Sequence, residues 1–160
     1  MIKHIKCDIF ESGADIICHQ VNCQGVMGSG IAKQVKEKFP EVYKRYIELY
    51  NTVPRRAQLL GFCQPCGTDL ISKNNRNTII MNLFAQEDFG YDGKCYTDYE
   101  ALRKCLDMVK YACSEDTIIA IPYLLGCYRA GGDWNIVYKM IEEIFGDSDC
   151  EVLICEYNGG

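Results

Sequence analysis

The sequence predicts an α/β domain with a largely parallel sheet and helices on both faces. Short apolar, β-branched runs alternate along the chain with segments whose apolar residues recur at helical spacing. Two glycine-bearing loops, the first glycine loop at 22–32 and the second at 125–134, each follow an expected strand and lead into an expected helix. The chain has 160 residues, enough for a substantial core, so we expect a single domain over 1–160.

Six segments have the composition of strands. The near-continuous apolar run in 15–22 is typical of a strand that is covered on both faces. An Asn-rich turn at 74–77 separates two further candidates, and Leu70 and Ile71 extend the earlier one as a ribbon. We expect strands over residues 2–10, 15–22, 58–63, 78–84, 117–122 and 151–157.

Four segments have helical apolar spacing and recognisable start signals. The first runs from 31 to 39, and Pro40 is well placed at the first turn of a second helix that reaches about residue 50. Thr97 and Glu100 have the form of a capping box for a third helix. Asp133 is an expected cap for a fourth helix that begins at Trp134.

Composition excludes several classes of partner. The net charge is -5 and no run of Lys or Arg exceeds two residues, so we expect no binding to a nucleic-acid backbone. No apolar stretch approaches the roughly 20 residues of a membrane span, and charged residues interrupt the N-terminus where a signal peptide needs an apolar core. The 11 cysteines are scattered through strand and helix patterns, which predicts buried thiols in a reducing cytoplasm.

One cysteine pair, Cys63-Gln64-Pro65-Cys66, has CxxC spacing. It is open to interpretation as a redox pair or as half of a zinc site. No second CxxC exists, and His4 and His19 are the only histidines, so we expect no metal.

The two glycine loops carry the strongest functional signal. A strand, a glycine loop and a helix N-terminus together offer unpaired backbone N–H groups to an anion. Two facing loops suit a diphosphate, and we expect Gly30 and Gly126 to approach it closely. The spacing matches neither a P-loop nor the dinucleotide-binding fingerprint. The alternative is that these glycines are ordinary turn residues.

Segments 8–9, 22–32, 82–86 and 126–134 together, in this order, resemble a macrodomain. The likeness is greatest to the small stand-alone branch that includes ADP-ribose 1″-phosphate phosphatases and terminal ADP-ribose protein glycohydrolases. The resemblance implies a three-layer α-β-α sandwich with a mixed six-stranded sheet. It also implies ADP-ribose in a cleft at the sheet edge and no cofactor.

The resemblance also implies roles for individual residues. Asp8 would accept a hydrogen bond from the adenine amino group beside the Ile9 backbone, and Asn22 would lie near the distal ribose. Tyr157 would be the aromatic residue near adenine. The alternatives are a surface aspartate at a strand end and an edge-strand core tyrosine. The diphosphate would be bracketed by Gly28, Ser29, Gly30 and Ile31 on one side and by Gly126, Cys127, Tyr128, Arg129 and Ala130 on the other.

His19 lies three residues before Asn22 in the strand that feeds the first glycine loop. A histidine here suits a general acid or base near pH 7. The alternative is a buried, hydrogen-bonded strand histidine with no role in catalysis. His19 and Asn22 are the catalytic candidates.

The chain departs from the family pattern in its second glycine loop. Tyr128 stands where the family usually has glycine. The glycohydrolase branch has a lysine and an acidic residue where this chain has Gln86 and Ala130. Lys94 and Asp98 lie near enough in sequence to substitute. The Ala-Gly-Gly-Asp-Trp ending of the loop favours the phosphatase-like branch.

The sequence therefore predicts an ADP-ribose-binding domain that hydrolyses a bond at the distal ribose. The bond is either the phosphate ester of ADP-ribose 1″-phosphate or an ADP-ribosyl ester on a protein. One alternative is a non-catalytic module that binds ADP-ribose on other proteins. Another is a structural or interaction domain that binds no nucleotide.

Overall fold

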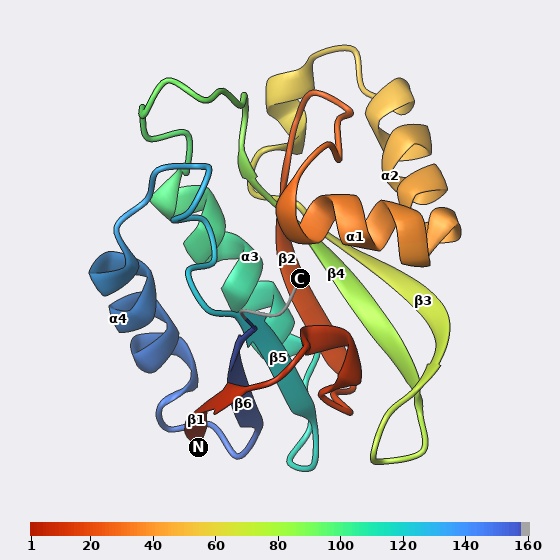
Figure 1. The fold of residues 1–160 in the computed structure, drawn as a ribbon, viewed down its shortest axis with the longest axis vertical. Coiled ribbons are helices and arrows are strands. Elements are labelled where there is room, and N and C mark those ends of the chain that lie inside the picture. Colours follow the sequence, from red (N-terminus) through yellow and green to blue (C-terminus); the bar gives the residue numbers. More distant parts are fainter. Residues whose placement is uncertain (158–160) are drawn as a thin grey trace.

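The computed structural model describes residues 1–157, and within them a six-stranded sheet lies between two pairs of helices (Figure 1). This arrangement confirms the expected three-layer sandwich. The strands are β1 (Ile2–Lys6), β2 (Ile16–Asn22), β3 (Cys63–Ile71), β4 (Asn77–Gln86), β5 (Ile118–Pro122) and β6 (Glu151–Glu156). The helices are α1 (Gly30–Lys38), α2 (Pro40–Thr52), α3 (Tyr99–Tyr111) and α4 (Trp134–Phe145), with short 3-10 helices η1 (Ile9–Glu11) and η2 (Arg56–Leu59).

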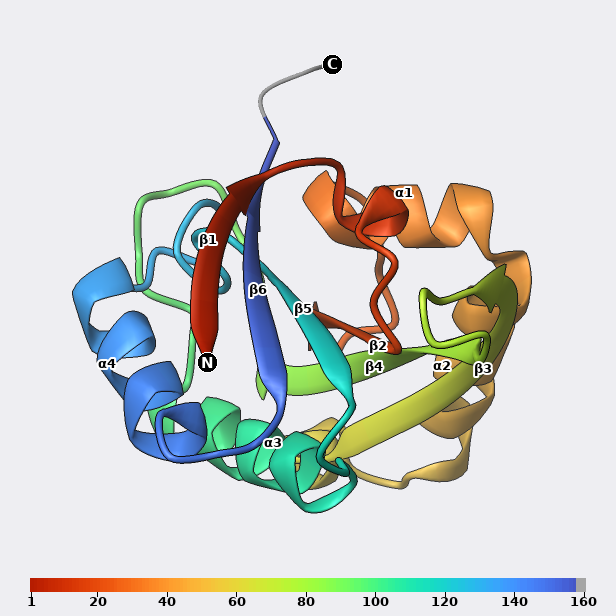
Figure 2. The ribbon, with the colours of Figure 1, turned by 90° about the horizontal axis from the view of Figure 1, so that it is seen from below.

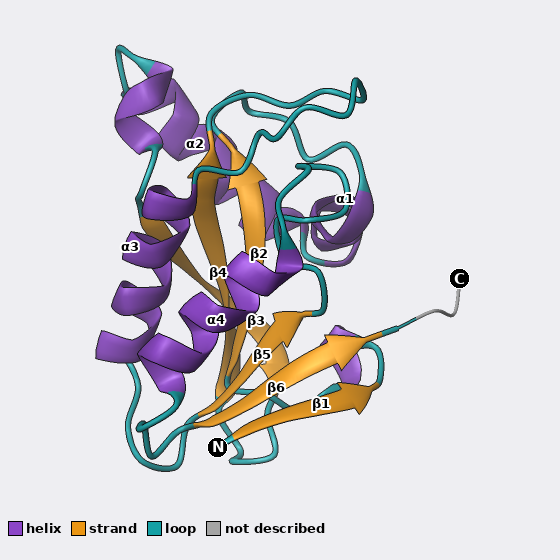
Figure 3. Ribbon diagram, turned by 90° about the vertical axis from the view of Figure 1, so that its left-hand side faces the viewer, coloured by secondary structure: helices purple, strands orange, loops and turns teal. Residues whose placement is uncertain are grey.

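The strand order is β1-β6-β5-β2-β4-β3, and the sheet is mixed because β3 alone runs antiparallel to its neighbour. Parallel strands end at the same edge of a sheet, where ligands bind in open α/β folds. The segments that leave β2, β4 and β5 therefore lie along one edge of the sheet; the arrowheads of β2 and β4 are side by side in Figure 3, with that of β5 below them. Both glycine loops belong to this edge.

Each face of the sheet is covered by one pair of helices. Helices α1 and α2 cover one face and α3 and α4 the other (Figure 2). Strand β2 alternates between them: Ile17 and Val21 join the core under α1 and α2, whereas Ile16 and Cys18 join the core under α3 and α4. This double burial is the reason why β2 reads as a continuous apolar run. No helix within residues 1–157 has both the length and the hydropathy needed to cross a membrane.

The first strand is shorter than the expected 2–10, because it ends at Lys6. Asp8 adopts an extended conformation as the N-cap of η1, and its Oδ1 accepts a hydrogen bond from the Phe10 N–H at 2.9 Å. Aspartate side chains compete with strand pairing in this way by offering the backbone a local partner. The prediction of a strand through Phe10 was therefore wrong.

Two further local predictions need correction. Residues 58–61 form η2 and a turn, and the strand expected at 58–63 begins instead at Cys63 and continues to Ile71. The N-cap of α3 is Asp98, whose side chain accepts from the Ala101 N–H, not the expected Thr97. The Thr97 hydroxyl is engaged elsewhere: it donates to the Gly126 carbonyl at 2.6 Å. Thr97 therefore does not cap α3, because its hydroxyl makes a tertiary contact with Gly126 that sequence spacing does not reveal.

Candidate functional site

A cleft of about 590 Å³ runs along the carboxyl ends of β6, β5, β2 and β4. The two glycine loops form its walls, and part of the β4–α3 loop (residues 87–98) lies at one end. Every site residue expected from the sequence lines it: Asp8, Ile9, His19, Asn22, Gly28, Ser29, Gly30, Ile31, Gly126, Cys127, Tyr128, Arg129, Ala130 and Tyr157. Residues up to 149 positions apart in the chain are thus brought to one cavity.

Asn22 braces the first glycine loop. Its Oδ1 accepts hydrogen bonds from the Gln24 N–H at 3.0 Å and the Tyr46 hydroxyl at 2.8 Å, and its Nδ2 donates to the Val26 carbonyl at 2.8 Å. Tyr46 is fully buried on α2, so the loop is anchored to the core through this side chain. One Nδ2 hydrogen is left for a ligand, because an amide NH₂ has two donors.

The N-terminus of α1 opens on the cleft. Ser29 occupies the N-cap position, but its side chain makes no capping hydrogen bond. The N–H groups of the first helical turn have no intrahelical partners, so they are available to an anion. Gly30 has a φ of +59°, and a Cβ built on it meets nothing within 4 Å. Its exposed side is therefore open cleft, as expected for a glycine that a ligand approaches.

Gly126 faces protein rather than open cleft. A Cβ built on it would lie 2.7 Å from Gln20 Oε1 and 3.0 Å from Thr97 Oγ1, and its φ is +71°. Its carbonyl accepts from the Thr97 hydroxyl and, at 2.9 Å, from the Gly132 N–H. The absence of a side chain at Gly126 is thus required for packing beneath the second glycine loop. This differs from the expectation that the missing side chain makes room for a diphosphate.

A chain of buried hydrogen bonds fixes the orientation of His19. The Arg45 carbonyl of α2 accepts from Gln64 Nε2 at 3.1 Å, so Gln64 Oε1 faces Asn82 and accepts from its Nδ2 at 3.0 Å. Asn82 Oδ1 then lies 2.5 Å from His19 Nε2. A carbonyl oxygen only accepts, so Nε2 carries the imidazole proton. Nδ1 is left with a lone pair and no partner among the described residues.

The environment keeps this imidazole neutral. His19 is 1% exposed. Burial lowers its pKa from about 6.5 to about 4, although the hydrogen bond with Asn82 acts in the opposite direction. At pH 7 the residue therefore offers an unprotonated Nδ1 as a hydrogen-bond acceptor. Both features match the alternative of a buried, hydrogen-bonded histidine, and its position on the cleft leaves the catalytic hypothesis open.

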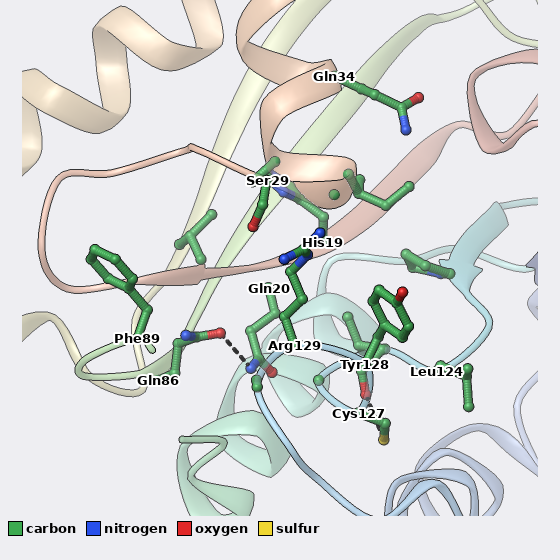
Figure 4. Close-up of a pocket in the computed structure, with 18 of the residues that line it drawn as sticks. His19, Gln20, Ser29, Gln34, Gln86, Phe89, Leu124, Cys127, Tyr128 and Arg129 are labelled. Atoms are coloured by element: carbon green, nitrogen blue, oxygen red, sulfur yellow. Dashed lines mark hydrogen bonds between the residues drawn. The ribbon is translucent and has the colours of Figure 1, made fainter. Parts of the chain in front are cut away.

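Gln20 is a cleft residue that the sequence did not single out. Its Nε2 donates to Gln86 Oε1 and to Thr97 Oγ1, both at 2.9 Å, and the bond to Gln86 is drawn in Figure 4. Both amide hydrogens are used, and Oε1 has no partner among the described residues. The one available signal was a polar side chain within an apolar strand, two residues before the loop. Other lining residues missed from the sequence include Val26, Phe89, Tyr91 and Leu124.

The cleft lining includes an arginine that lies near two tyrosine rings. The Arg129 guanidinium lies 5.7 Å from the Tyr128 ring centre and 5.2 Å from that of Tyr91, in the β4–α3 loop. Of the two charged residues considered as substitutes, Lys94 pairs with Asp92 at 3.7 Å and Asp98 caps α3. Neither lines the cleft, whereas Gln86 and Ala130 do.

The opposite end of the cleft is acidic. Asp8 uses Oδ1 to cap η1, and Oδ2 has no hydrogen-bond partner within residues 1–157. Tyr157 lies nearby at the end of the described chain and is 58% exposed. Glu156 also lines this end, where its Oε1 lies 2.9 Å from His4 Nε2.

The CxxC cysteines lie in β3 on opposite faces of the sheet. Cys63 packs against the core under α3 and α4, whereas Cys66 belongs to the core under α1 and α2. Burial raises the pKa of the Cys63 thiol to about 12. A strand directs residues three apart to opposite faces, so the two sulfurs cannot meet in one site. Within the described part of the chain, no three His, Cys, Asp or Glu side chains are grouped to hold a metal ion.

The chain is similar in sequence to a set of ADP-ribose-processing enzymes. It is 28% identical over 174 aligned positions to the ADP-ribose 1″-phosphate phosphatase of Saccharomyces cerevisiae, covering 91% of this chain and 94% of that one. A shorter match, 40% identical over 50 residues, covers 29% of the phosphatase of Meyerozyma guilliermondii. A third, 39% identical over 46 residues, covers 13% of the DNA ADP-ribosyl glycohydrolase of Mycobacterium tuberculosis. No protein-family model matches the chain.

Solved structures of macrodomains superpose on the whole chain. The macrodomain of Thermus aquaticus DarG is 22% identical, with a TM-score of 0.75 and 99% of each chain covered. The macrodomain protein from Streptomyces coelicolor is 20% identical, with a TM-score of 0.75 and 100% of each chain covered. Thermosipho africanus DarTG in complex with ADP-ribose has a TM-score of 0.78 at 20% identity, covering 97% of this chain and 41% of that one.

We predict that His19 makes folding stability depend on pH. Its pKa is lower in the folded state than in the unfolded state, so the unfolded chain binds the proton more readily. Stability is full above about pH 6.5 and is lost as the pH falls towards 4. At about 1.36 kcal/mol per pKa unit, the loss is on the order of 3 kcal/mol. Denaturant unfolding at several pH values measures it.

His19→Gln should reduce this pH dependence, because glutamine does not titrate. His4→Gln is the matched control: it removes the other histidine, which is on the surface, and should leave the steep loss in place. Equal pH dependence in parent and His19→Gln would contradict the low pKa of His19.

A second prediction separates the two glycines. Gly30→Ala and Gly126→Ala carry a similar backbone cost of about 1–2 kcal/mol, because both have positive φ. Gly126→Ala should cost more stability, since its Cβ would displace Gln20 from two hydrogen bonds. Gly30→Ala should cost more ligand affinity, since its Cβ enters open cleft. Thermal unfolding and calorimetric titration measure the two quantities, and the reverse ranking would refute the assignment of the two glycines.

Proposed function

The chain has the macrodomain fold, and from that premise we propose that it binds ADP-ribose in the cleft between the two glycine loops. We further propose that it hydrolyses the phosphate ester of ADP-ribose 1″-phosphate. The observation that supports this most is the cleft itself: a cavity of about 590 Å³ with a helix N-terminus on one wall. The Saccharomyces cerevisiae relative, which aligns over 94% of its own length, is named for this reaction.

In the proposed complex, adenine lies at the Asp8 end of the cleft. The unpartnered Asp8 Oδ2 accepts from the adenine amino group, and Ile9 and Tyr157 contact the ring. The diphosphate lies between the first turn of α1 and the backbone of residues 126–130. The helix N-terminus stabilises its charge without a lysine. The distal ribose then reaches the carboxyl end of β2, near Asn22 and His19.

The reaction is a hydrolysis. A water oxygen forms a bond to phosphorus, the bond between phosphorus and the 1″ oxygen breaks, and a proton from water ends on that ribose oxygen. The free Nδ2 hydrogen of Asn22 is suited to orient the ribose or the water. The neutral His19 Nδ1 is suited to accept a hydrogen bond from a hydroxyl or from water, although its low pKa makes it a weak base.

A second candidate is a module that binds ADP-ribose without turnover. Gln86 and Ala130 replace the charged pair of the glycohydrolase branch, and the His19 pKa of about 4 favours hydrogen bonding over proton transfer at neutral pH. A third candidate is hydrolysis of ADP-ribosyl esters on protein. The matches to DNA ADP-ribosyl glycohydrolases cover short segments only.

We also propose a cytoplasmic location, because the cysteines of the described residues are free thiols, as is usual in a reducing compartment.

We predict that Asp8→Asn changes base preference. Asparagine keeps an oxygen for the Phe10 N–H, so the cap of η1 is retained while an NH₂ group replaces Oδ2. Two donors would then face each other at the adenine amino group. ADP-ribose affinity should fall by about 1–3 kcal/mol. Affinity for the deaminated analogue, which has a carbonyl at this position, should rise.

Calorimetric titration of both nucleotides against parent and variant provides the measurement. Glu156→Gln is the control, because it changes a carboxylate at the same end that pairs with His4. An unaltered preference in Asp8→Asn would show that adenine is not recognised there. Failure of the parent to bind ADP-ribose at all would reject the proposed function.

We predict that the parent releases phosphate from ADP-ribose 1″-phosphate and that Asn22→Ala lowers kcat more than affinity. Tyr46→Phe separates the two roles of Asn22, because it removes one brace of the loop without entering the cleft. If Asn22 acts only by bracing, Tyr46→Phe should change kcat and affinity in the same proportion as Asn22→Ala, to a smaller extent, because it removes one of several braces. A pH transition caused by His19 should lie near 4, with activity lost below it, and be absent in His19→Gln. Binding without phosphate release would favour the non-catalytic module.

A further inference from the structure

The charged residues that line the cleft are separated by sign. Asp8 and Glu156 lie at the β1–β6 end. Arg129 is the one lysine or arginine among the described residues that line the cleft. Its guanidinium lies beside Tyr91, which follows β4. Asp8 follows β1, whereas Tyr91 lies in the loop after β4, and strands β6, β5 and β2 separate β1 from β4 in the sheet. The contact with Tyr91 therefore places the guanidinium towards the β4 side of the cleft, away from Asp8.

The Arg129 guanidinium is positioned but has no anionic partner. The rings of Tyr91 and Tyr128 lie within 6 Å of it, and both are largely exposed, at 72% and 78%. Cation–π contact uses the face of a guanidinium and leaves the N–H groups at its edge free. Within residues 1–157 this side chain has no carboxylate within 4.0 Å and makes no hydrogen bond. The edge is therefore available to a ligand.

A diphosphate does not require this group. In the proposed complex the diphosphate lies in the middle of the cleft, at the N-terminus of α1, whose first-turn N–H groups have no intrahelical partners. The only charged group of ADP-ribose is its diphosphate, so its distal ribose is uncharged. ADP-ribose 1″-phosphate adds a phosphate monoester there, which is the anion whose geometry a guanidinium edge matches with two parallel hydrogen bonds.

We propose, on the basis of the proposed function, that Arg129 is a specificity-determining residue that binds the terminal phosphate of ADP-ribose 1″-phosphate. Tyr91 of the β4–α3 loop and Tyr128 of the second glycine loop position the Arg129 guanidinium. The site thereby selects the phosphorylated nucleotide over ADP-ribose and over uncharged esters at the same carbon. Figure 4 shows Arg129 and Tyr128 among the side chains around the cleft.

The test compares two ligands on matched variants. Both ADP-ribose and ADP-ribose 1″-phosphate compete with a fluorescent ADP-ribose analogue, and the signal is read by rapid mixing before the first turnover. The parent should prefer the phosphorylated ligand. Arg129→Gln should reduce that preference about tenfold or more, as expected for lost hydrogen bonds to a charged group. Affinity for ADP-ribose itself should change little, and the preference should weaken as salt is added.

Arg56→Gln is the control. Arg56 is also exposed and lies 5.3 Å from a tyrosine ring, that of Tyr50, but it does not line the cleft. Its loss changes the net charge equally and should leave the preference intact. Arg129→Lys should retain the charge and recover only part of the preference, because an ammonium is not a planar fork.

Three outcomes would overturn the inference. Equal weakening of both ligands in Arg129→Gln would assign the guanidinium to the diphosphate. No change for either ligand would show that Arg129 does not contact the nucleotide, and a parent without preference would show that the terminal phosphate is not read. In each of these cases ADP-ribose still binds the parent. A parent that binds neither ligand rejects the proposed function instead.

Discussion

The floor of the cleft depends on hydrogen bonds whose direction is set by backbone carbonyls. A carbonyl only accepts, so each one fixes which end of the neighbouring amide or hydroxyl faces it. The Arg45 carbonyl acts in this way through Gln64 and Asn82 to His19, and the Gly126 carbonyl acts through Thr97 to Gln20. Two adjacent residues of β2, pointing to opposite faces of the sheet, thereby present acceptor atoms without partners.

Such unpartnered acceptors are costly within a folded domain. A buried polar atom without a hydrogen bond costs about 1–3 kcal/mol. His19 Nδ1 and Gln20 Oε1 both lie at the carboxyl end of β2, where the cleft begins, and apolar cores lie on both sides of this strand. Their concentration at the cavity is the expected pattern for a site whose ligand, or the water that it positions, completes the hydrogen bonding.

Hydrogen bonds from behind the two glycine loops keep the site in shape. The Ala130 carbonyl accepts from the Tyr96 N–H, and Thr97 reaches the Gly126 carbonyl, so the second glycine loop is tied to the β4–α3 loop. The first glycine loop is tied to α2 by Tyr46. The two walls are therefore held from behind, which leaves their inner surfaces free for a ligand.

The sequence by itself determined the layered α/β architecture, both glycine loops and, largely through the family resemblance, 14 of the residues that line the cleft. Periodicity and glycine placement are local signals, and parallel strands bring their carboxyl ends to one edge whatever the details. Only the tertiary structure decided that Thr97 bonds Gly126 instead of capping α3, that Gly126 faces Gln20, and that His19 is neutral. These properties arise from contacts between strands and loops far apart in the chain and from burial, and residue spacing encodes neither.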